Sequence, residues 1–418
     1  MDIEVFIFLT SGLFLGWALG ANDAANVFGT AVGTKMVKFS TAAIICSIFI
    51  VIGAVWGGAG TTDTLGKLGA VNALPGAFMV AFSAALSVLL MTKAGLPVST
   101  SQAIVGGIIG WNYFSGTVTD TPTLVKIMTT WVLCPVLAAF FSAIIFKLTV
   151  KAMAGAKIHL IRIDSYTRLG LILAGAFGAY SLGANNIANV MGVFVLSVPL
   201  EDVSIGGLLT LSSMQQLFLL GAIAIAVGVF TYSRGVMITV GRNLLPLSPI
   251  GAWVAVISHS IVLFLFASQG LQHALESSGL PSIPLVPVSS SQAIVGGVLG
   301  IAFVQGLQGF QWKAFGSIGL GWIVTPIMAG AICFVGLFFL QNVFTQNTHR
   351  DVPYVLSADV IDRIAKANVS VTALTSIKGN LYPNAIKLAK ALADISEYSA
   401  EDRKKILSFS PLVLILKV

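Results

Sequence analysis

Long apolar runs, each about as long as a membrane crossing, dominate the chain. A bilayer core of about 30 Å is crossed by roughly 20 apolar residues in helical form. Runs that fit occupy residues 3–19, 41–59, 76–92, 123–146, 166–182, 214–231, 250–268 and 315–341. They predict an all-α integral membrane protein.

Two of these runs are followed by nearly the same polar sequence. Residues 20–26 read GANDAAN and residues 183–189 read GANNIAN. Each copy places three polar side chains where a membrane helix should be apolar: Asn22, Asp23 and Asn26, then Asn185, Asn186 and Asn189. Because glycine permits unusual backbone conformations, we expect helix breaks at Gly20 and Gly183. Carbonyl groups freed by a break are tolerated in a membrane only inside protein or along a cavity.

A second repeated stretch lies further along each half. Residues 98–110 and 288–300 agree almost letter for letter. Pro97 and Pro287 disfavour helix just before them, and the hydroxyl residues that follow are good helix N-caps. Each run therefore predicts the start of a helix too short to cross alone, as in re-entrant segments. Their polar residues are Thr100, Ser101 and Gln102, then Ser290, Ser291 and Gln292.

The two motifs occur in the same order in both halves of the chain. A Trp and a Pro four residues apart follow the second motif each time, at Trp131 and Pro135 and at Trp322 and Pro326. The second half is longer between its motifs, so it contains an insertion. Duplication with interrupted segments is typical of secondary transporters built from pseudo-two-fold repeats. We expect the two repeats to be inverted, which requires an odd number of crossings in each.

Charge placement divides the chain into four parts. We assign residues 1–146 to membrane repeat 1, 147–165 to a basic linker, 166–345 to membrane repeat 2 and 350–418 to a tail. Basic loops face the cytoplasm, which places the linker inside the cell and gives no reason to expect nucleic acid as a partner. The tail is rich in charge, and we expect it to be small, soluble and mostly helical, with its closing apolar run, 412–416, a candidate to pack on the membrane domain.

Overall composition agrees with a multi-pass protein of the cell membrane. The chain is 56% hydrophobic and 9% charged, with a mean hydropathy of +0.94. Soluble domains carry about 25% charged residues, so much of this surface must face lipid. The three cysteines lie inside apolar spans without metal-type spacing and are interpreted as core residues.

Asp23 is nearly the only ionisable residue in the apolar spans. A carboxylate at that depth costs roughly 2.5–3.5 kcal/mol on insertion scales and indicates a functional site. The alternative is structural, because Asp and Asn also hydrogen-bond neighbouring membrane helices. Carboxylate, amide and carbonyl oxygens suit a hard cation such as sodium. We assign a sodium site to Asn22, Asp23, Asn26, Asn185, Asn186 and Asn189.

The helix starts of the second motif suit an anion instead. Helix N-termini present free N–H groups and the positive end of the macrodipole. Hydroxyls and glutamine amides add donors, so two such starts would form a pocket for a tetrahedral oxyanion; the alternative is two capped helices without a ligand. No Lys or Arg lies in the apolar interior near these motifs, which favours neutralisation by bound cations.

At these residues the chain resembles the inorganic phosphate transporter (PiT) family. That family carries a GANDxAN-type motif near the start of each half, seen here as Gly20–Asn26 followed by Val-Phe-Gly-Thr30, and paired Ser/Thr-Ser-Gln runs. The resemblance covers about residues 1–345 and leaves the tail outside. It implies a symporter that carries phosphate down a sodium or proton gradient between inverted repeats. The family often has Asp in both copies, whereas the second copy here has Asn186, and some relatives carry sulfate.

We therefore expect a secondary active symporter that imports inorganic phosphate with sodium by alternating access, with no other cofactor and as a candidate homodimer. Proton coupling and sulfate transport are alternatives within the family. The phosphate site is assigned to Thr100, Ser101, Gln102, Ser290, Ser291, Gln292, Asn22 and Asn185. A membrane hydrolase using Ser and His259 is disfavoured, because the chain has no GxSxG or HExxH run. A passive channel fits the duplication less well.

Overall fold

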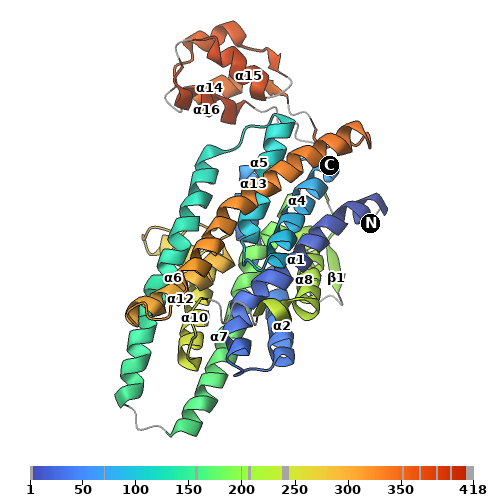
Figure 1. Ribbon diagram of the computed structural model, residues 1–418. Coiled ribbons are helices and arrows are strands. Elements are labelled where there is room, and N and C mark those ends of the chain that lie inside the picture. The colour runs from blue at the N-terminus through green and yellow to red at the C-terminus, as the bar shows by residue number, and fades with distance from the viewer. Residues whose placement is uncertain are drawn as a thin grey trace.

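The computed structural model describes residues 3–69, 71–155, 159–198, 200–205, 209–237, 244–350, 353–366, 369–382, 385–395 and 398–410. Repeat 1 contains α1 (Ile3–Gly33), α2 (Phe39–Gly57), α3 (Ala59–Leu68), α4 (Leu74–Lys93), α5 (Thr100–Ser115) and α6 (Thr121–Gly155). Repeat 2 contains α7 (Leu160–Met191), α8 (Ser213–Thr231), α10 (Pro249–Leu265), α11 (Gln269–Ser277), α12 (Ser290–Val304) and α13 (Trp312–Asn342). Figure 1 shows these helices as one elongated bundle.

The bundle has the composition of a membrane domain. Among the described residues, α1, α2, α4, α6, α7, α8 and α13 are long and apolar enough to cross a bilayer. Helices α10 and α11 form an eighth candidate span, bent by 65° between them. Apolar side chains such as Ile48, Phe140 and Ile323 are exposed on the outer faces, as lipid-facing positions are. The prediction of an all-α multi-pass membrane protein is confirmed.

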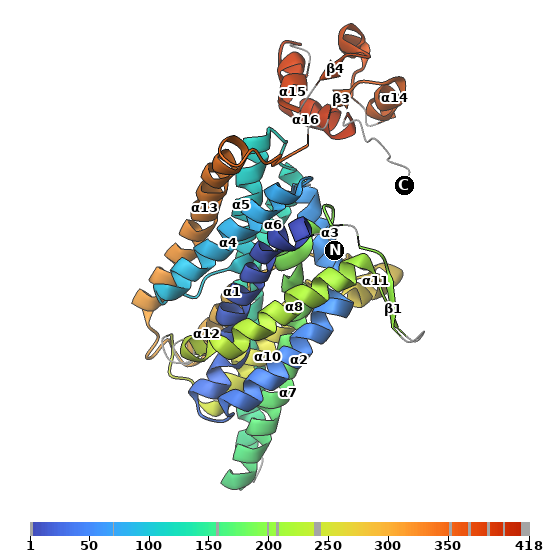
Figure 2. The same cartoon turned by 90° about the vertical axis from the view of Figure 1, so that its right-hand side faces the viewer.

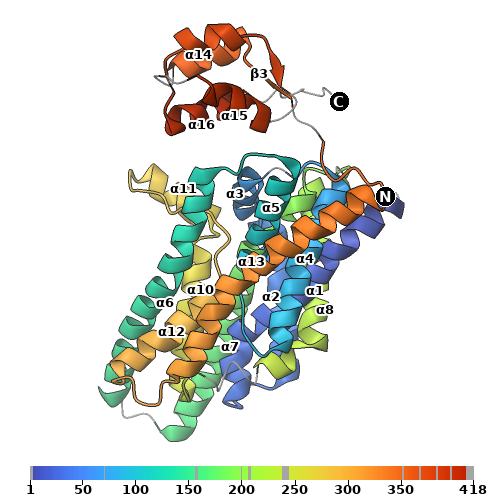
Figure 3. The same ribbon diagram turned by 45° about the horizontal axis from the view of Figure 1, so that its top comes forward.

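The two repeats interlock through matched contacts. Helix α1 packs on α8 while α7 packs on α2, and α5 packs on α13 while α12 packs on α6. Figure 2 shows α2 and α8 side by side, and Figure 3 shows α13 crossing α5. Each short helix therefore lies against a long helix of the other repeat, and α5 and α12 extend toward opposite ends of the bundle (Figure 1). This is the arrangement of inverted repeats.

Glycines allow the backbones of the crossing helices to approach each other closely. A Cβ on Gly106 of α5 would lie 2.1 Å from the Pro326 carbonyl oxygen of α13, and one on Gly296 of α12 would lie 2.2 Å from the Pro135 carbonyl oxygen of α6. Only residues without a side chain allow backbones to approach this closely. The small-residue rows thus hold the scaffold together.

The expected helix breaks at Gly20 and Gly183 are wrong. Both α1 and α7 continue without interruption through their polar motifs. The two glycines instead permit close packing, since a Cβ on Gly20 would lie 2.0 Å from the Ile225 carbonyl oxygen and one on Gly183 would lie 2.2 Å from that of Ile50. An intact helix satisfies its own backbone hydrogen bonds, which a membrane interior favours strongly. The interruptions occur elsewhere, in the extended segments before α5 and α12 and between α10 and α11.

The insertion in repeat 2 is visible as extra elements. An antiparallel hairpin of β1 (Val203–Ile205) and β2 (Leu209–Leu211) follows the short helix η1 (Gly192–Phe194). Helix α11 and an extended segment then separate α10 from α12. These additions lie on the end of the bundle from which the tail departs (Figure 2).

The tail forms its own small unit. It contains β3 (Tyr354–Val355), α14 (Ala358–Lys366), η2 (Thr372–Ile377), β4 (Leu381–Tyr382), α15 (Ala385–Ala393) and α16 (Ala400–Phe409), with β3 and β4 antiparallel. Its separate apolar core includes Leu356, Ile364, Leu374, Leu388 and Ile406. The prediction of a mostly helical tail is confirmed, whereas the run 412–416 lies outside the described residues.

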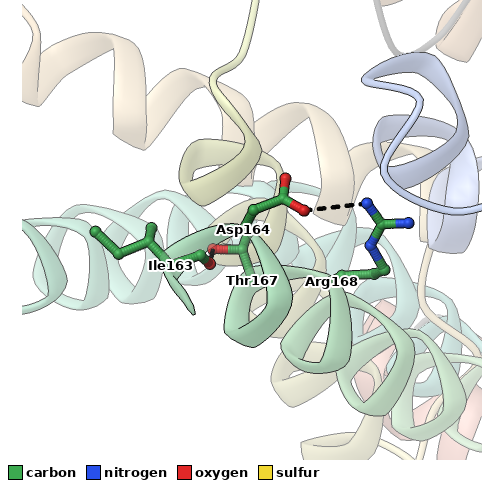
Figure 4. Close-up of polar contacts among 4 residues, drawn as sticks. All are labelled: Ile163, Asp164, Thr167 and Arg168. Carbon is green, nitrogen blue, oxygen red and sulfur yellow. Dashed lines mark hydrogen bonds and ion pairs between the residues drawn. The ribbon is translucent and has the colours of Figure 1, made fainter. Parts of the chain in front are cut away.

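The basic linker is built largely from the ends of α6 and α7, and the tail lies at the opposite end of the bundle (Figure 1). On the first turns of α7, Arg168 Nη2 donates to Asp164 Oδ2 at 3.1 Å, and Thr167 Oγ1 donates to the Ile163 carbonyl at 2.8 Å (Figure 4). The ion pair is more than half exposed, so it contributes little to stability.

Candidate substrate and ion site

The short helices α5 and α12 begin as the sequence predicts. The Ser99 hydroxyl accepts the Gln102 N–H at 3.2 Å, and the Ser289 hydroxyl accepts the Gln292 N–H at 3.2 Å. Each is thus the N-cap of its helix. The first N–H groups of a helix have no acceptor within it, so both starts offer donors and a positive dipole end.

Asp23 is held by donors from two elements. Thr100 Oγ1 donates to Asp23 Oδ2 at 2.9 Å, and Asn22 Nδ2 donates to Asp23 Oδ1 at 2.9 Å. Asn22 Nδ2 also donates to the Val98 carbonyl at 2.9 Å, which ties α1 to the extended segment before α5. The first motif therefore meets the helix start of its own repeat at the carboxylate.

The second motif has a parallel arrangement around a neutral amide. Asn186 Oδ1 accepts from Asn189 Nδ2 at 2.9 Å and from Ser101 Oγ at 3.2 Å. Asn185 holds the extended segment before α12, because its Nδ2 donates to the Val286 carbonyl at 3.1 Å and its Oδ1 accepts the Val288 N–H at 2.8 Å. Asn186 thus occupies the position of Asp23 without its charge.

Contacts between the repeats unite the two clusters into one site. Asn26 Nδ2 donates to Ser290 Oγ at 3.2 Å, and Asn189 Nδ2 donates to Ser101 Oγ at 2.8 Å. All twelve residues assigned from the sequence lie in or beside this cluster, and none is more than 4% exposed. The site is therefore occluded from both ends of the bundle. The Ser291 hydroxyl oxygen lies 3.1 Å from that of Ser289, the N-cap of α12.

Several amide oxygens in the site have no hydrogen-bond partner among the described residues. They are Oδ1 of Asn22, Asn26 and Asn189 and Oε1 of Gln102 and Gln292. A buried polar atom left unsatisfied costs about 1–3 kcal/mol, so these free acceptors, which lie on the polar motifs of α1 and α7 and on the first turns of α5 and α12, make a candidate ligand site. Amide oxygens accept and do not donate, and with the Asp23 carboxylate they fit a hard cation.

A small cavity reaches the edge of the cluster. It has a volume of about 180 Å³ and is lined by Asn26, by Leu96 and Pro97 of the extended segment, and by residues of α12 and α13. The cavity thus lies where the short helix of one repeat meets the interrupted segment of the other. Asn26 is thus the member of the cluster that lines a cavity.

Charge is unbalanced around the site. The segments that carry it, residues 1–34, 94–125, 169–233 and 243–312, contain no Lys or Arg. Asp23 is the carboxylate of the cluster. An anion bound here would have no cationic side chain from these segments to neutralise it.

His259 belongs to the cluster although the sequence analysis gave it no transport role. It lies fully buried on α10, with Nε2 at 2.9 Å from Ser290 Oγ. A sequence signal existed, since a lone histidine in an apolar span is as unusual as Asp23. Its contact with Ser290 joins α10 to α12, which no local sequence pattern shows.

Comparisons with known proteins agree with this fold. A phosphate permease, so named provisionally, of Methanocaldococcus jannaschii is 27% identical over 336 residues, which covers 80% of this chain and 97% of the relative. The sulfate permease CysP of Bacillus subtilis is 28% identical over 361 residues, or 82% of this chain and 90% of the relative. A solved structure described as the sodium-dependent phosphate transporter matches the fold with a TM-score of 0.66 at 23% identity, covering 81% of this chain and 99% of that one.

The sequence pattern of the phosphate transporter family matches residues 19–163, 149–273 and 283–410. The last match extends through the tail, so the expectation that the tail lies outside the resemblance is wrong. These proteins are transporters, which confirms that the chain is not an enzyme. The chain belongs to the phosphate transporter family.

Proposed function

We propose that the protein is a secondary active symporter that moves inorganic phosphate into the cell together with sodium. The observation that carries this proposal is the joint site, in which one carboxylate and five unsatisfied amide oxygens lie beside two helix starts. Cation ligands and anion donors thus share one occluded pocket.

Sodium is the cation that the ligands favour. The Asp23 carboxylate and the free amide oxygens of Asn22 and Asn26 are hard donors, which suit Na⁺. Phosphate and Asp23 are both negative, so more than one bound cation would lower the charge of the filled site. The likeness to a structure described as sodium-dependent supports the same choice.

Phosphate is assigned to the helix starts. The N–H groups at Thr100, Ser101, Ser290 and Ser291, together with the Ser290 hydroxyl, supply donors for its oxygens. The side-chain amides of Gln102, Gln292, Asn22 and Asn185 complete the assignment. The interface of the two repeats, near the bilayer midplane, is where such carriers bind substrate.

Alternating access follows from the same geometry. The site is formed by contacts between the repeats, such as Asn26 to Ser290 and Ser101 to Asn186. Rocking one repeat against the other would open the occluded site to one side at a time. Filling the site with cation and anion together stabilises the occluded state, which couples their movement.

Sulfate is the second candidate substrate, because CysP is a relative named as a sulfate permease. Both anions are tetrahedral and accept hydrogen bonds, so the donors described here do not separate them by shape. Competition separates them: we expect tenfold excess sulfate to leave labelled phosphate uptake largely intact.

The proposal is tested with purified protein in liposomes. We expect an inward sodium gradient at equal pH to drive phosphate above its external concentration. A pH gradient at equal sodium should not. Phosphate accumulation that is independent of sodium and follows the pH gradient would show that protons, not sodium, are the coupling ion. Strong competition by sulfate would show that the substrate assignment is wrong.

A further inference from the structure

His259 and Ser290 form a contact that the proposed transport cycle does not yet explain. His259 Nε2 lies 2.9 Å from Ser290 Oγ, while His259 Nδ1 has no partner among the described residues. Asn26 Nδ2 donates to the same hydroxyl oxygen at 3.2 Å. All three side chains are buried, so water does not supply the missing bonds from bulk solvent.

The missing partner of Nδ1 indicates which ring nitrogen carries the proton. If Nδ1 carried it, a buried N–H would be left without an acceptor, which is rare in proteins. If Nε2 carries it, the unsatisfied atom is an acceptor, and Nε2–H donates to Ser290 Oγ. The Ser290 oxygen then accepts from both His259 and Asn26, which uses both of its lone pairs.

That arrangement determines the direction of the Ser290 hydroxyl proton. With both lone pairs occupied, the hydroxyl has only its own O–H to offer, so it acts as a donor to whatever fills the site. Thr100, the matching residue of repeat 1, instead gives its proton to Asp23 at 2.9 Å. Thr100 therefore offers the site its lone pairs, whereas Ser290 offers its proton.

The difference between the repeats follows the sequence. When Gly76-Ala77 is aligned with Gly251-Ala252, Ser83 matches Ser258 and Ala84 matches His259. Repeat 1 has the carboxylate and no histidine, while repeat 2 has the histidine and the neutral Asn186. The two ionisable side chains are connected by a chain of contacts, from Asp23 through Asn26 and Ser290 to His259.

We propose that His259 is a positioning residue that makes the Ser290 hydroxyl a dedicated hydrogen-bond donor to the transported anion, whereas the Thr100 hydroxyl, which donates to Asp23, serves the cation. This proposal rests on the proposed function only in taking an oxyanion as the ligand. It predicts that loss of the His259 contact weakens anion binding and leaves sodium binding nearly unchanged.

Two substitutions of His259 by amide residues, which are equally polar but differ in length, test its contact with Ser290. In His259→Gln the side-chain nitrogen falls near the position of Nε2 and still donates to Ser290, whereas the shorter side chain in His259→Asn does not reach. We expect His259→Asn to raise the KM for phosphate roughly tenfold, the effect of one lost hydrogen bond, with kcat and half-saturating sodium unchanged. His259→Gln should restore most of the affinity.

Ser290→Ala and Ser258→Ala complete the set. Ser290→Ala should raise the phosphate KM as His259→Asn does, and the double variant should show no further rise, because both act through one hydroxyl. Ser258→Ala changes the adjacent residue and should behave as wild type. Additive effects in the double variant, or equal KM values for the Gln and Asn variants, would overturn the proposal.

The ring tautomer gives a readout that needs no transport. Nitrogen NMR of histidine-labelled protein, with the His259→Gln variant to identify the signal, should show the proton on Nε2; a proton on Nδ1 alone contradicts the proposal. If the wild-type protein transports sulfate in place of phosphate, the KM values of the same variants are measured for sulfate. That result would correct the substrate assignment and leave the role of His259 to be decided by the variants.

Discussion

Asn26 of α1 donates its side-chain amide to the Ser290 hydroxyl of α12, 3.2 Å away and 264 residues later in the chain. The contact joins the first motif of repeat 1 to the second motif of repeat 2. The reverse link runs from Asn189 of α7 to Ser101 of α5 at 2.8 Å. The site thus exists only while the two repeats are together, which is the basis for the predictions below.

Asp23→Asn should abolish sodium-driven uptake. The substitution keeps the shape of the side chain but removes the one carboxylate of the cluster. Loss of a charged partner is worth about 1.5–3 kcal/mol, or roughly 10–100-fold in affinity. The measurement is phosphate uptake by liposomes against external sodium. Asp63→Asn, at an exposed acid of α3, is the control and should not change uptake. Normal sodium dependence in Asp23→Asn would remove Asp23 from the mechanism.

Asn186→Asp should add a cation requirement. Asn186 Oδ1 accepts from Ser101 and Asn189, while its Nδ2 has no partner among the described residues. A carboxylate would keep both hydrogen bonds and lose none, so the main change is charge. We expect steeper dependence of uptake on sodium, with the Hill coefficient rising by about one, and weaker phosphate binding at low sodium. An unchanged sodium curve would place Asn186 outside the cation site.

Gly296→Ala should destabilise the membrane domain. A Cβ there would lie 2.2 Å from the Pro135 carbonyl oxygen. Forcing α12 away from α6 should cost about 1–3 kcal/mol and lower the thermal unfolding temperature in detergent. Gly316→Ala on α13 is the matched control, since a Cβ there meets nothing within 4 Å. Equal melting temperatures for the two variants would contradict the interlocked packing.

Much of the site was predictable because the chain is duplicated. Matched motifs at Gly20 and Gly183, and at Thr100 and Ser290, identified the polar residues that the structure brings together. The continuity of α1 was not predictable from Gly20 alone. Glycine weakens a helix by only about 1 kcal/mol, and the lipid environment favours unbroken backbone hydrogen bonding more strongly.

Contacts between elements distant in the chain could not be predicted from the sequence. The crossing of α5 on α13 depends on close approach at Gly106, which a row of glycines permits but does not assign to a partner. The role of His259 depends on its distance to Ser290 in another element. Local patterns identify residues of unusual chemistry; only packing shows what they touch.

The tail should lie on the opposite side of the membrane from the linker. The linker end of the bundle carries Lys35 and Lys38 between α1 and α2, Lys151 near the end of α6 and Arg162 near the start of α7, which favours a cytoplasmic position for that end. We expect Lys378→Cys in the tail to react with an impermeant thiol reagent in whole cells, and Arg162→Cys to react only after permeabilisation. The three native cysteines are buried and give a low background. Labelling in the reverse order would invert the orientation.

Coupling between phosphate and sodium is tested most directly by asking whether a phosphate gradient drives sodium uptake. Labelled sodium, at equal concentration and equal pH on both sides, is followed into liposomes while an inward phosphate gradient is imposed. If both ions occupy the site joined by Asn26 and Ser290, the phosphate gradient should accumulate sodium, and Asp23→Asn should prevent this. Phosphate entry with no net movement of sodium would contradict the account.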